Sequence, residues 1–313
     1  MSIDNRLVTL VGGSGFLGRY AARALLKAGW RVRIVERDPR NAWYLKSQGN
    51  LGQTQFVAAD IRKPATLARA LQGSDSVVNF VGILKGDFEA FHVEGAANIA
   101  EAAAGAGAES LVHISAIGAD ADSASAYGRS KAAGEARVRA AFPGATILRP
   151  SIVFGREDQF INRFAGMQNA PVVPVLRPAV KFQPVFAGDV ARAVLAAVEN
   201  PHDFAGKTFE LGGPDVLSMM ELQRWIAAET HRDPNFVEVP DAFGGLLAKL
   251  TGWLPGAPIT SDQWAMLQHD NVVAPGAAGL NDLGVTATPL AAIAPGWLVL
   301  YQRNGRFGRK SVA

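Results

Sequence analysis

Short apolar, β-branched runs alternate with segments of helical periodicity through the first half of the chain. The apolar runs predict strands at Leu7–Val11, Arg31–Val35, Gln55–Ala58, Ser76–Val81, Ser110–Ile114 and Thr146–Leu148. The intervening segments predict helices at Gly15–Ala28, Pro64–Leu71, Phe88–Ala106 and Ala126–Ala141. Because parallel strands need a crossover connection, this alternation predicts an α/β fold with a doubly wound parallel sheet.

The alternation ends near residue 155, where prolines become frequent. Later helices are expected at Asp189–Val198, Ser218–Thr230 and Asp241–Trp253. We therefore expect one domain over residues 1–155 and a smaller, mostly helical region for a substrate or partner over 156–313. Within that region, segments near 184–190 and 208–212 are expected to return to the main sheet.

Composition narrows the class of protein. The chain has no cysteine, and its five histidines show no metal-ligand spacing, so we expect no metal centre. A net charge of +3 without a basic stripe argues against nucleic acid. The N-terminus lacks the pattern of a signal peptide, and no apolar run has the length of a membrane span, so a cytoplasmic location is expected.

A glycine motif follows the first predicted strand and opens the first helix. Gly12, Gly15 and Gly18 have the spacing that allows a tight turn, close approach of a pyrophosphate and close packing of helix on strand. The helix start at Phe16 and Leu17 presents free N–H groups to phosphates. The motif, in its strand–turn–helix context, predicts a dinucleotide site on a Rossmann-type fold.

The end of the second strand is where the adenosine ribose is read. A carboxylate there accepts from the 2′-hydroxyl of NAD, whereas an arginine pairs with the 2′-phosphate of NADP. This chain has both, Glu36 and then Arg37, and Arg19 is a second candidate cation. The two arginines favour NADP(H) over NAD(H), and Glu36 opposes that choice if it points inward.

Further candidates lie at the ends of the third and fourth strands. Asp60 and Ile61 are placed to meet the adenine, while Asn79, Val81 and Gly82 are expected beside the cofactor. Turn chemistry at strand ends is the alternative explanation for these five residues.

A third group offers acid–base chemistry. Tyr127 and Lys131 are spaced i, i+4 on a predicted helix, so both face the same way, and Ser115 ends the strand before it. A nearby ammonium favours the phenolate, which would bring the pKa of Tyr127 down towards neutrality. Ser115 is then placed to hydrogen-bond a substrate carbonyl as hydride moves. In the alternative, Tyr127 only packs and Lys131 is a solvated helix residue.

With these motifs in one order, the chain resembles the extended or atypical short-chain dehydrogenase/reductases. The stretches His92–Ile99, Leu148–Pro150 and Val185–Ala191 are similar to later landmarks of that branch. Residues 154–162, Phe-Gly-Arg-Glu-Asp-Gln-Phe-Ile-Asn, resemble a narrower family, the NAD(P)H-binding accessory subunits of respiratory complex I and their bacterial relatives.

The resemblance implies a tightly held nucleotide, with NADPH favoured. It places Arg37 and Arg19 near the phosphates, and Tyr127 and Lys131 at the nicotinamide end. It also implies complex I subunits as partners at the cytoplasmic face of the inner membrane. The alternative is a free NADPH-dependent reductase of a carbonyl or quinone-like substrate that uses Ser115, Tyr127 and Lys131.

An apolar stripe over Asp241–Pro255 bears on the partner. It is formed by Phe243, Leu246, Leu247, Leu250, Trp253 and Leu254. Such a stripe is most typical of a core-facing helix. The alternative is a surface helix that docks on a membrane-bound partner or lies in the lipid interface, helped by the basic tail Arg303–Lys310.

Overall fold

The computed structural model describes residues 6–252 and 259–307, which form two compact units. Unit 1 takes the described residues up to 150 with 187–211 and 274–286, and unit 2 takes those in 151–186, 212–273 and from 287 onwards. The chain therefore returns to unit 1 twice; the sequence predicted a boundary near residue 155 with segments near 184–190 and 208–212 returning to the main sheet. The returning segments supply a helix and an edge strand to unit 1, which a contiguous division would separate from their packing partners.

Unit 1 is built on a parallel sheet in the order β11-β6-β5-β4-β1-β2-β3. Its strands are β1 Leu7–Val11, β2 Arg31–Glu36, β3 Thr54–Ala58, β4 Ser76–Asn79, β5 Ser110–Ile114, β6 Thr146–Pro150 and β11 Thr208–Leu211. The predicted doubly wound α/β fold is confirmed. From β1 the chain builds the sheet outwards through β2 and β3, and from β4 it builds in the opposite direction through β5 and β6. Ligands of such sheets bind at this switch point between β1 and β4.

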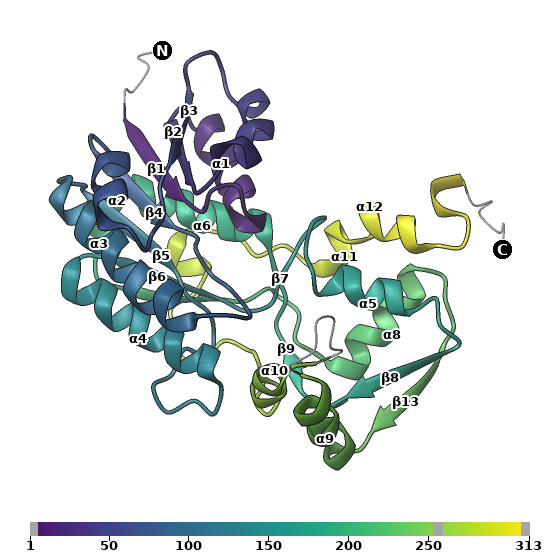
Figure 1. Ribbon diagram of the computed structural model, residues 1–313. Coiled ribbons are helices and arrows are strands. Elements are labelled where there is room, and N and C mark those ends of the chain that lie inside the picture. The colour runs from purple at the N-terminus through teal and green to yellow at the C-terminus, as the bar shows by residue number, and fades with distance from the viewer. Residues whose placement is uncertain (1–5, 253–258, 308–313) are drawn as a thin grey trace. The chain divides into compact units, whose positions relative to one another are not determined.

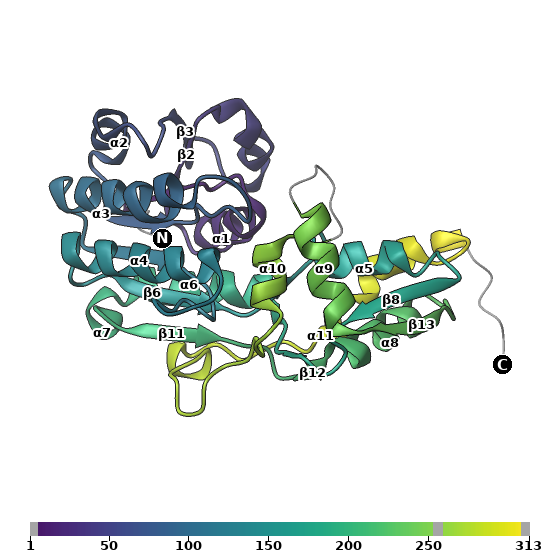
Figure 2. The same ribbon diagram turned by 60° about the horizontal axis from the view of Figure 1, so that its bottom comes forward.

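Helices cover both faces of this sheet (Figure 1). The helices α2 Pro64–Leu71, α3 Gly95–Gly105 and α4 Ala126–Ala141 pack in one layer, and α3 and α4 run alongside each other (Figure 2). The helices α1 Phe16–Lys27 and α6 Ala187–Glu199 pack against each other in the second layer. Every residue of β1, β4 and β5 is consequently buried, which explains their continuous apolar runs.

Two elements differ from the sequence prediction. The expected helix Phe88–Ala106 begins as a π-helix, Glu89–Glu94, and only then continues as α3. The expected strand Ser76–Val81 ends at Asn79, because the Asn79 side chain accepts the Val81 N–H and turns the chain.

The two segments expected to return to the main sheet have different outcomes. Thr208–Leu211 does return, pairing with β6 at the sheet edge. The segment 184–190 does not: Val185–Phe186 forms β10, which pairs with β7 Val153–Phe154 in a separate two-stranded sheet, and α6 begins at Ala187. The position beside β6 is taken by β11, and Val185 and Phe186 pair instead with Val153 and Phe154, which follow β6 in the chain.

Unit 2 combines short helices with three two-stranded sheets. The sheets pair β7 with β10, β9 Lys181–Phe182 with β12 Leu217–Ser218, and β8 Val172–Leu176 with β13 Asn235–Val239. Its helices are α5 Ile161–Met167, α8 Met219–Glu229, α9 Asp241–Thr251, α10 Ser261–Met266, α11 Leu290–Ile293 and α12 Pro295–Leu298. Phe154, Ile161, Leu222, Ile226 and Leu298 form its buried core.

The Phe154–Asn162 segment is a helix-capping loop of unit 2. The buried Asp158 carboxylate accepts backbone N–H groups from Gly155, Phe160, Ile161 and Asn162. These bonds satisfy the orphan donors at the start of α5. The aspartate of this segment therefore has a structural role in positioning the loop.

No helix among the described residues is long and apolar enough to cross a membrane. Within the same residues, no group of three or more histidine, aspartate or glutamate side chains is arranged to hold a metal ion.

Candidate nucleotide site

A pocket opens in unit 1 at the carboxyl ends of β1, β2, β3 and β4. Fifteen residues line it. Eight of them were not predicted from the sequence to contact the cofactor, and seven were. The first set is Val11, Ser14, Val35, Ala59, Phe80, Ile83, Phe91 and Glu36, the last of which was considered as an opposing group. The second set is Gly12, Gly15, Arg37, Asp60, Ile61, Val81 and Gly82.

The glycine turn forms the floor of this pocket. Gly12 has φ +78°, a left-handed conformation that favours glycine, and a Cβ there would lie 3.2 Å from Val81 Cγ2. A Cβ on Gly18 would lie 2.5 Å from the Gly13 carbonyl oxygen. Gly15 precedes the first residue of α1, Phe16. Gly18, Phe16, Leu17 and Arg19 do not line the pocket, and Phe16 and Leu17 contribute the N-terminus of α1 beside it.

Glu36 points inward, onto the glycine turn. Its Oε1 accepts both the Ser14 backbone N–H at 2.8 Å and the Ser14 hydroxyl at 2.6 Å. The Tyr44 hydroxyl donates to the Ser14 carbonyl at 2.8 Å, and the Arg19 guanidinium lies 5.1 Å above the Tyr44 ring. Ser14 and Tyr44 were missed by sequence reasoning because their role depends on the fold of the turn.

The charged residues that follow β2 differ in whether they form an ion pair. Asp38 accepts from Arg40 at 2.8 Å, and these hydrogen bonds hold the pKa of the Asp38 carboxyl below its usual range. Arg37 is exposed, lines the pocket, and has no hydrogen-bond or ion-pair partner in the described part of the chain. Its guanidinium is thus available to a ligand anion.

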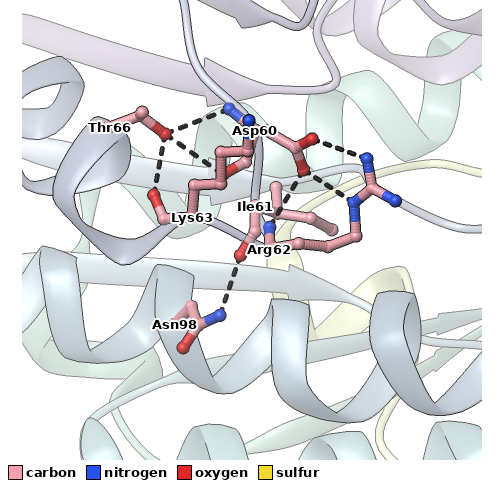
Figure 3. Close-up of polar contacts among 6 residues, drawn as sticks. All are labelled: Asp60, Ile61, Arg62, Lys63, Thr66 and Asn98. Carbon is pink, nitrogen blue, oxygen red and sulfur yellow. Dashed lines mark hydrogen bonds and ion pairs between the residues drawn. The ribbon is translucent and has the colours of Figure 1, made fainter.

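Asp60 and Ile61 form the wall that follows β3 (Figure 3). Arg62 donates to both Asp60 carboxylate oxygens at 3.0 and 2.6 Å, and these bonds lower the pKa of Asp60 to about 2. Thr66 and Lys63 complete the turn, and the Asn98 amide donates to the Ile61 carbonyl at 2.8 Å. Asp60 is therefore a carboxylate at neutral pH, able to accept from the exocyclic amine of an adenine.

Asn79 is buried and lies behind the pocket wall. Its Nδ2 donates to His113 Nδ1 at 3.0 Å, and its Oδ1 accepts the Val81 N–H at 2.9 Å. Burial lowers the pKa of His113 well below its usual value, which fits an unprotonated acceptor nitrogen. Asn79 therefore orients Val81 and Gly82, which do line the pocket, and does not line it itself.

The three expected catalytic residues lie on two neighbouring elements. Ser115 directly follows β5, and Tyr127 and Lys131 lie on α4. The Ser115 hydroxyl is buried without a hydrogen-bond partner in the described residues. The Lys131 ammonium donates to the Ile114 carbonyl at 2.8 Å, and burial lowers its pKa to about 8. Burial raises the pKa of Tyr127 to about 12, so the expected lowering of this pKa towards neutrality is wrong, because removal of the phenol from water dominates.

The protein is similar to known families across most of its length. Residues 8–212 match the NAD dependent epimerase/dehydratase family. The chain belongs to this family. NAD(P) binding is therefore a property of this protein by family, and the Rossmann-type site described above has the geometry for it.

Individual relatives refine the picture. Over 297 residues the chain is 36% identical to NADH dehydrogenase (ubiquinone) 1 alpha subcomplex subunit 9 of Mus musculus mitochondria, covering 92% of this chain and 78% of that one. Over 248 residues it is 34% identical to the ceramide reductase of Caulobacter vibrioides, covering 77% and 76%. These family members confirm the resemblance that the motifs indicated.

A solved structure confirms the fold alone. The NADPH-dependent quinone oxidoreductase of Escherichia coli, crystallised with NADPH, matches with a TM-score of 0.76 at 20% identity, covering 93% of this chain and 99% of that one.

Proposed function

We propose that this protein is an accessory subunit of respiratory complex I that holds NADP(H) in the pocket of unit 1. The observation that carries the proposal is the 36% identity to a complex I subunit over 92% of the chain. That alignment is too long to rest on the family-wide dinucleotide region, residues 8–212, alone.

The residues proposed to hold the nucleotide follow from their places in the sheet. Gly12, Gly15 and the start of α1 receive the pyrophosphate, Asp60 and Ile61 receive the adenine, and Arg37 receives the 2′-phosphate. One oxygen of Glu36 accepts hydrogen bonds from Ser14, and Asp38 is paired with Arg40. These neighbouring carboxylates therefore compete less with a ligand 2′-phosphate for the Arg37 guanidinium. The exposed Arg37 supports NADP(H), whereas the inward-pointing Glu36 opposes that choice.

Replacing Arg37 by alanine tests the cofactor. A charge-assisted hydrogen bond contributes about 1.5–3 kcal/mol, so the Kd for NADPH should rise roughly 10- to 100-fold in Arg37→Ala while that for NADH changes little. Titration of both nucleotides into the purified protein measures this, and Arg69→Ala, an exposed change of equal charge on α2, is the control. Equal losses for both nucleotides would instead assign the ribose to Glu36 and NAD.

A surface on α9 supports a docking role for unit 2. Phe243, Leu246 and Leu250 lie at helical spacing with exposed fractions of 66%, 53% and 63%, so this part of the stripe does not face a core. Trp253, Leu254 and Pro255, the side chain of Leu247 and tail residues 308–310 lie outside what the structure describes. We infer that the α9 face contacts a membrane-bound complex I subunit or the adjoining membrane surface, on the cytoplasmic side of the inner membrane.

Fractionation of native membranes tests the assembly. After gentle solubilisation, the protein should co-migrate with NADH:quinone reductase activity, and Leu246→Glu with Leu250→Glu on α9 should release it. Trp43→Glu, an acidic substitution at an exposed position of the 3₁₀ helix η1 (Pro39–Gln48), serves as the control. A protein that stays wholly soluble at low salt and never co-migrates with that activity contradicts the subunit function.

A free NADPH-dependent reductase is the second candidate. The buried, unpartnered Ser115 hydroxyl favours it, because such a group is expected where a ligand carbonyl completes the hydrogen bonding. The 34% sequence identity to a ceramide reductase favours this function as well. In this function Tyr127 donates a proton to the carbonyl or quinone-like substrate, and Lys131 stabilises the phenolate that forms.

A further inference from the structure

His92 connects the pocket wall to α4 through a directed chain of hydrogen bonds. The Ile83 backbone N–H donates to His92 Nε2 at 3.0 Å, and His92 Nδ1 lies 2.8 Å from the Ser130 hydroxyl. That hydroxyl donates its only proton to the Tyr127 carbonyl at 2.8 Å, so it accepts from His92. The chain therefore fixes His92 as the neutral tautomer with its proton on Nδ1.

The packing around His92 holds its ring in one orientation. His92 is 2% exposed, and its ring stacks on Phe88 at 5.2 Å and meets Tyr127 edge-on at 5.4 Å. Burial and the neighbouring Lys131 charge lower the pKa of His92 to about 4, which keeps the ring neutral at physiological pH.

The backbone of His92 also contacts α4. The residue lies in the π-helical turn Glu89–Glu94, and its carbonyl lies so close to Gly134 that a Cβ there would be 2.1 Å away. Short π-helical segments inside helices frequently occur at functional sites. Here the turn brings both the side chain and the carbonyl of His92 against the helix that carries Tyr127 and Lys131.

The sheet order places Ile83 in the nicotinamide half of the pocket. Glu36, Arg37 and Asp60 follow β2 and β3, on one side of β1, whereas Ile83 follows β4 on the other side. A dinucleotide laid across the switch point has its adenosine over the first side and its nicotinamide over the second.

We propose that His92 is a positioning residue that couples the nicotinamide half of the nucleotide pocket to α4. Through Ile83 it sets the pocket wall, and through Ser130 and Tyr127 it sets the helix that faces the nicotinamide. The proposal rests on the nucleotide-binding function proposed above, and it assigns His92 no contact with substrate.

Comparing a whole dinucleotide with its adenosine half tests this coupling. His92→Phe keeps the stacked ring but removes both hydrogen bonds. The Kd for NADPH should rise about tenfold, while that for adenosine 2′,5′-bisphosphate stays within about twofold. His92→Gln, whose amide supplies one acceptor and one donor, should recover most of the affinity for NADPH. His202→Phe, at an exposed position on α7 (Pro201–Phe204), is the control.

Ser130→Ala provides a second, milder variant that removes only the acceptor for Nδ1–H. It should weaken NADPH in the same direction, and nitrogen NMR of the imidazole should show a changed Nδ1 shift, because Nδ1–H loses its acceptor while the Ile83 N–H still donates to Nε2. Equal losses for NADPH and the bisphosphate, or unchanged NADPH binding in both His92→Phe and Ser130→Ala, overturn the coupling. Wild-type protein that binds neither ligand overturns the nucleotide site and the coupling together.

Discussion

Replacement of Gly18 by valine should weaken nucleotide binding by at least about 100-fold. The Cβ alone would lie 2.5 Å from the Gly13 carbonyl oxygen and 2.6 Å from the Gly13 carbonyl carbon, and neither backbone atom can rotate away. The start of α1 must therefore move off the glycine turn. Because each hydrogen bond to a charged phosphate contributes about 1.5–3 kcal/mol, losing two of them accounts for the expected effect.

Calorimetric titration with NADPH measures this loss, and thermal unfolding of the same samples reports the packing cost, about 1–3 kcal/mol for an overpacked site. Gly105→Val is the matched control, since a Cβ at that exposed end of α3 meets no atom within 4 Å. Retention of wild-type affinity in Gly18→Val would show that the α1 N-terminus does not hold the pyrophosphate.

Tyr127→Phe should reduce turnover by about 10²- to 10⁴-fold in the reductase function, with the Kd for NADPH nearly unchanged. The substitution removes the transferable proton and keeps the ring that packs on Phe88 and His92. Steady-state NADPH oxidation with a carbonyl or quinone acceptor measures turnover, and direct titration measures affinity. Wild-type turnover in Tyr127→Phe would exclude Tyr127 as the proton donor, and a wild-type protein without turnover would leave only the subunit function.

The pH profile of the same reaction adds a directional test. With a pKa of about 12, Tyr127 keeps its proton throughout the range from pH 6 to 10 and remains a donor. Lys131, with a pKa of about 8, is charged below that pH and neutral above it. The value of kcat/KM should therefore be level below pH 8 and fall above it, as the ammonium that stabilises the phenolate is lost. Lys131→Met should be slow at every pH and lack this alkaline fall.

The sequence alone determined most of the architecture of unit 1 and predicted the glycine turn that contributes to its candidate nucleotide pocket. Strand and helix periodicity are local properties, and the glycine motif specifies the β1 turn through backbone conformation, as the positive φ of Gly12 shows. The resemblance to a family was also visible in the sequence. The motif Phe154–Asn162 can be read there because it encodes a local structure, a capping loop around Asp158.

Only the tertiary structure decided which side chains face the pocket and how they are charged. Asn79 was named from its strand-end position, yet its partner His113 lies on the neighbouring strand and turns it into a support for Val81. Glu36 bonds to Ser14 across a turn, and the coupling of His92 to Ile83 and Ser130 joins residues up to 38 positions apart. The pKa of Tyr127 rises because the side chain is buried, which the i, i+4 spacing to Lys131 does not reveal. Burial and long-range pairing depend on the whole fold, and no local pattern of residue types specifies them.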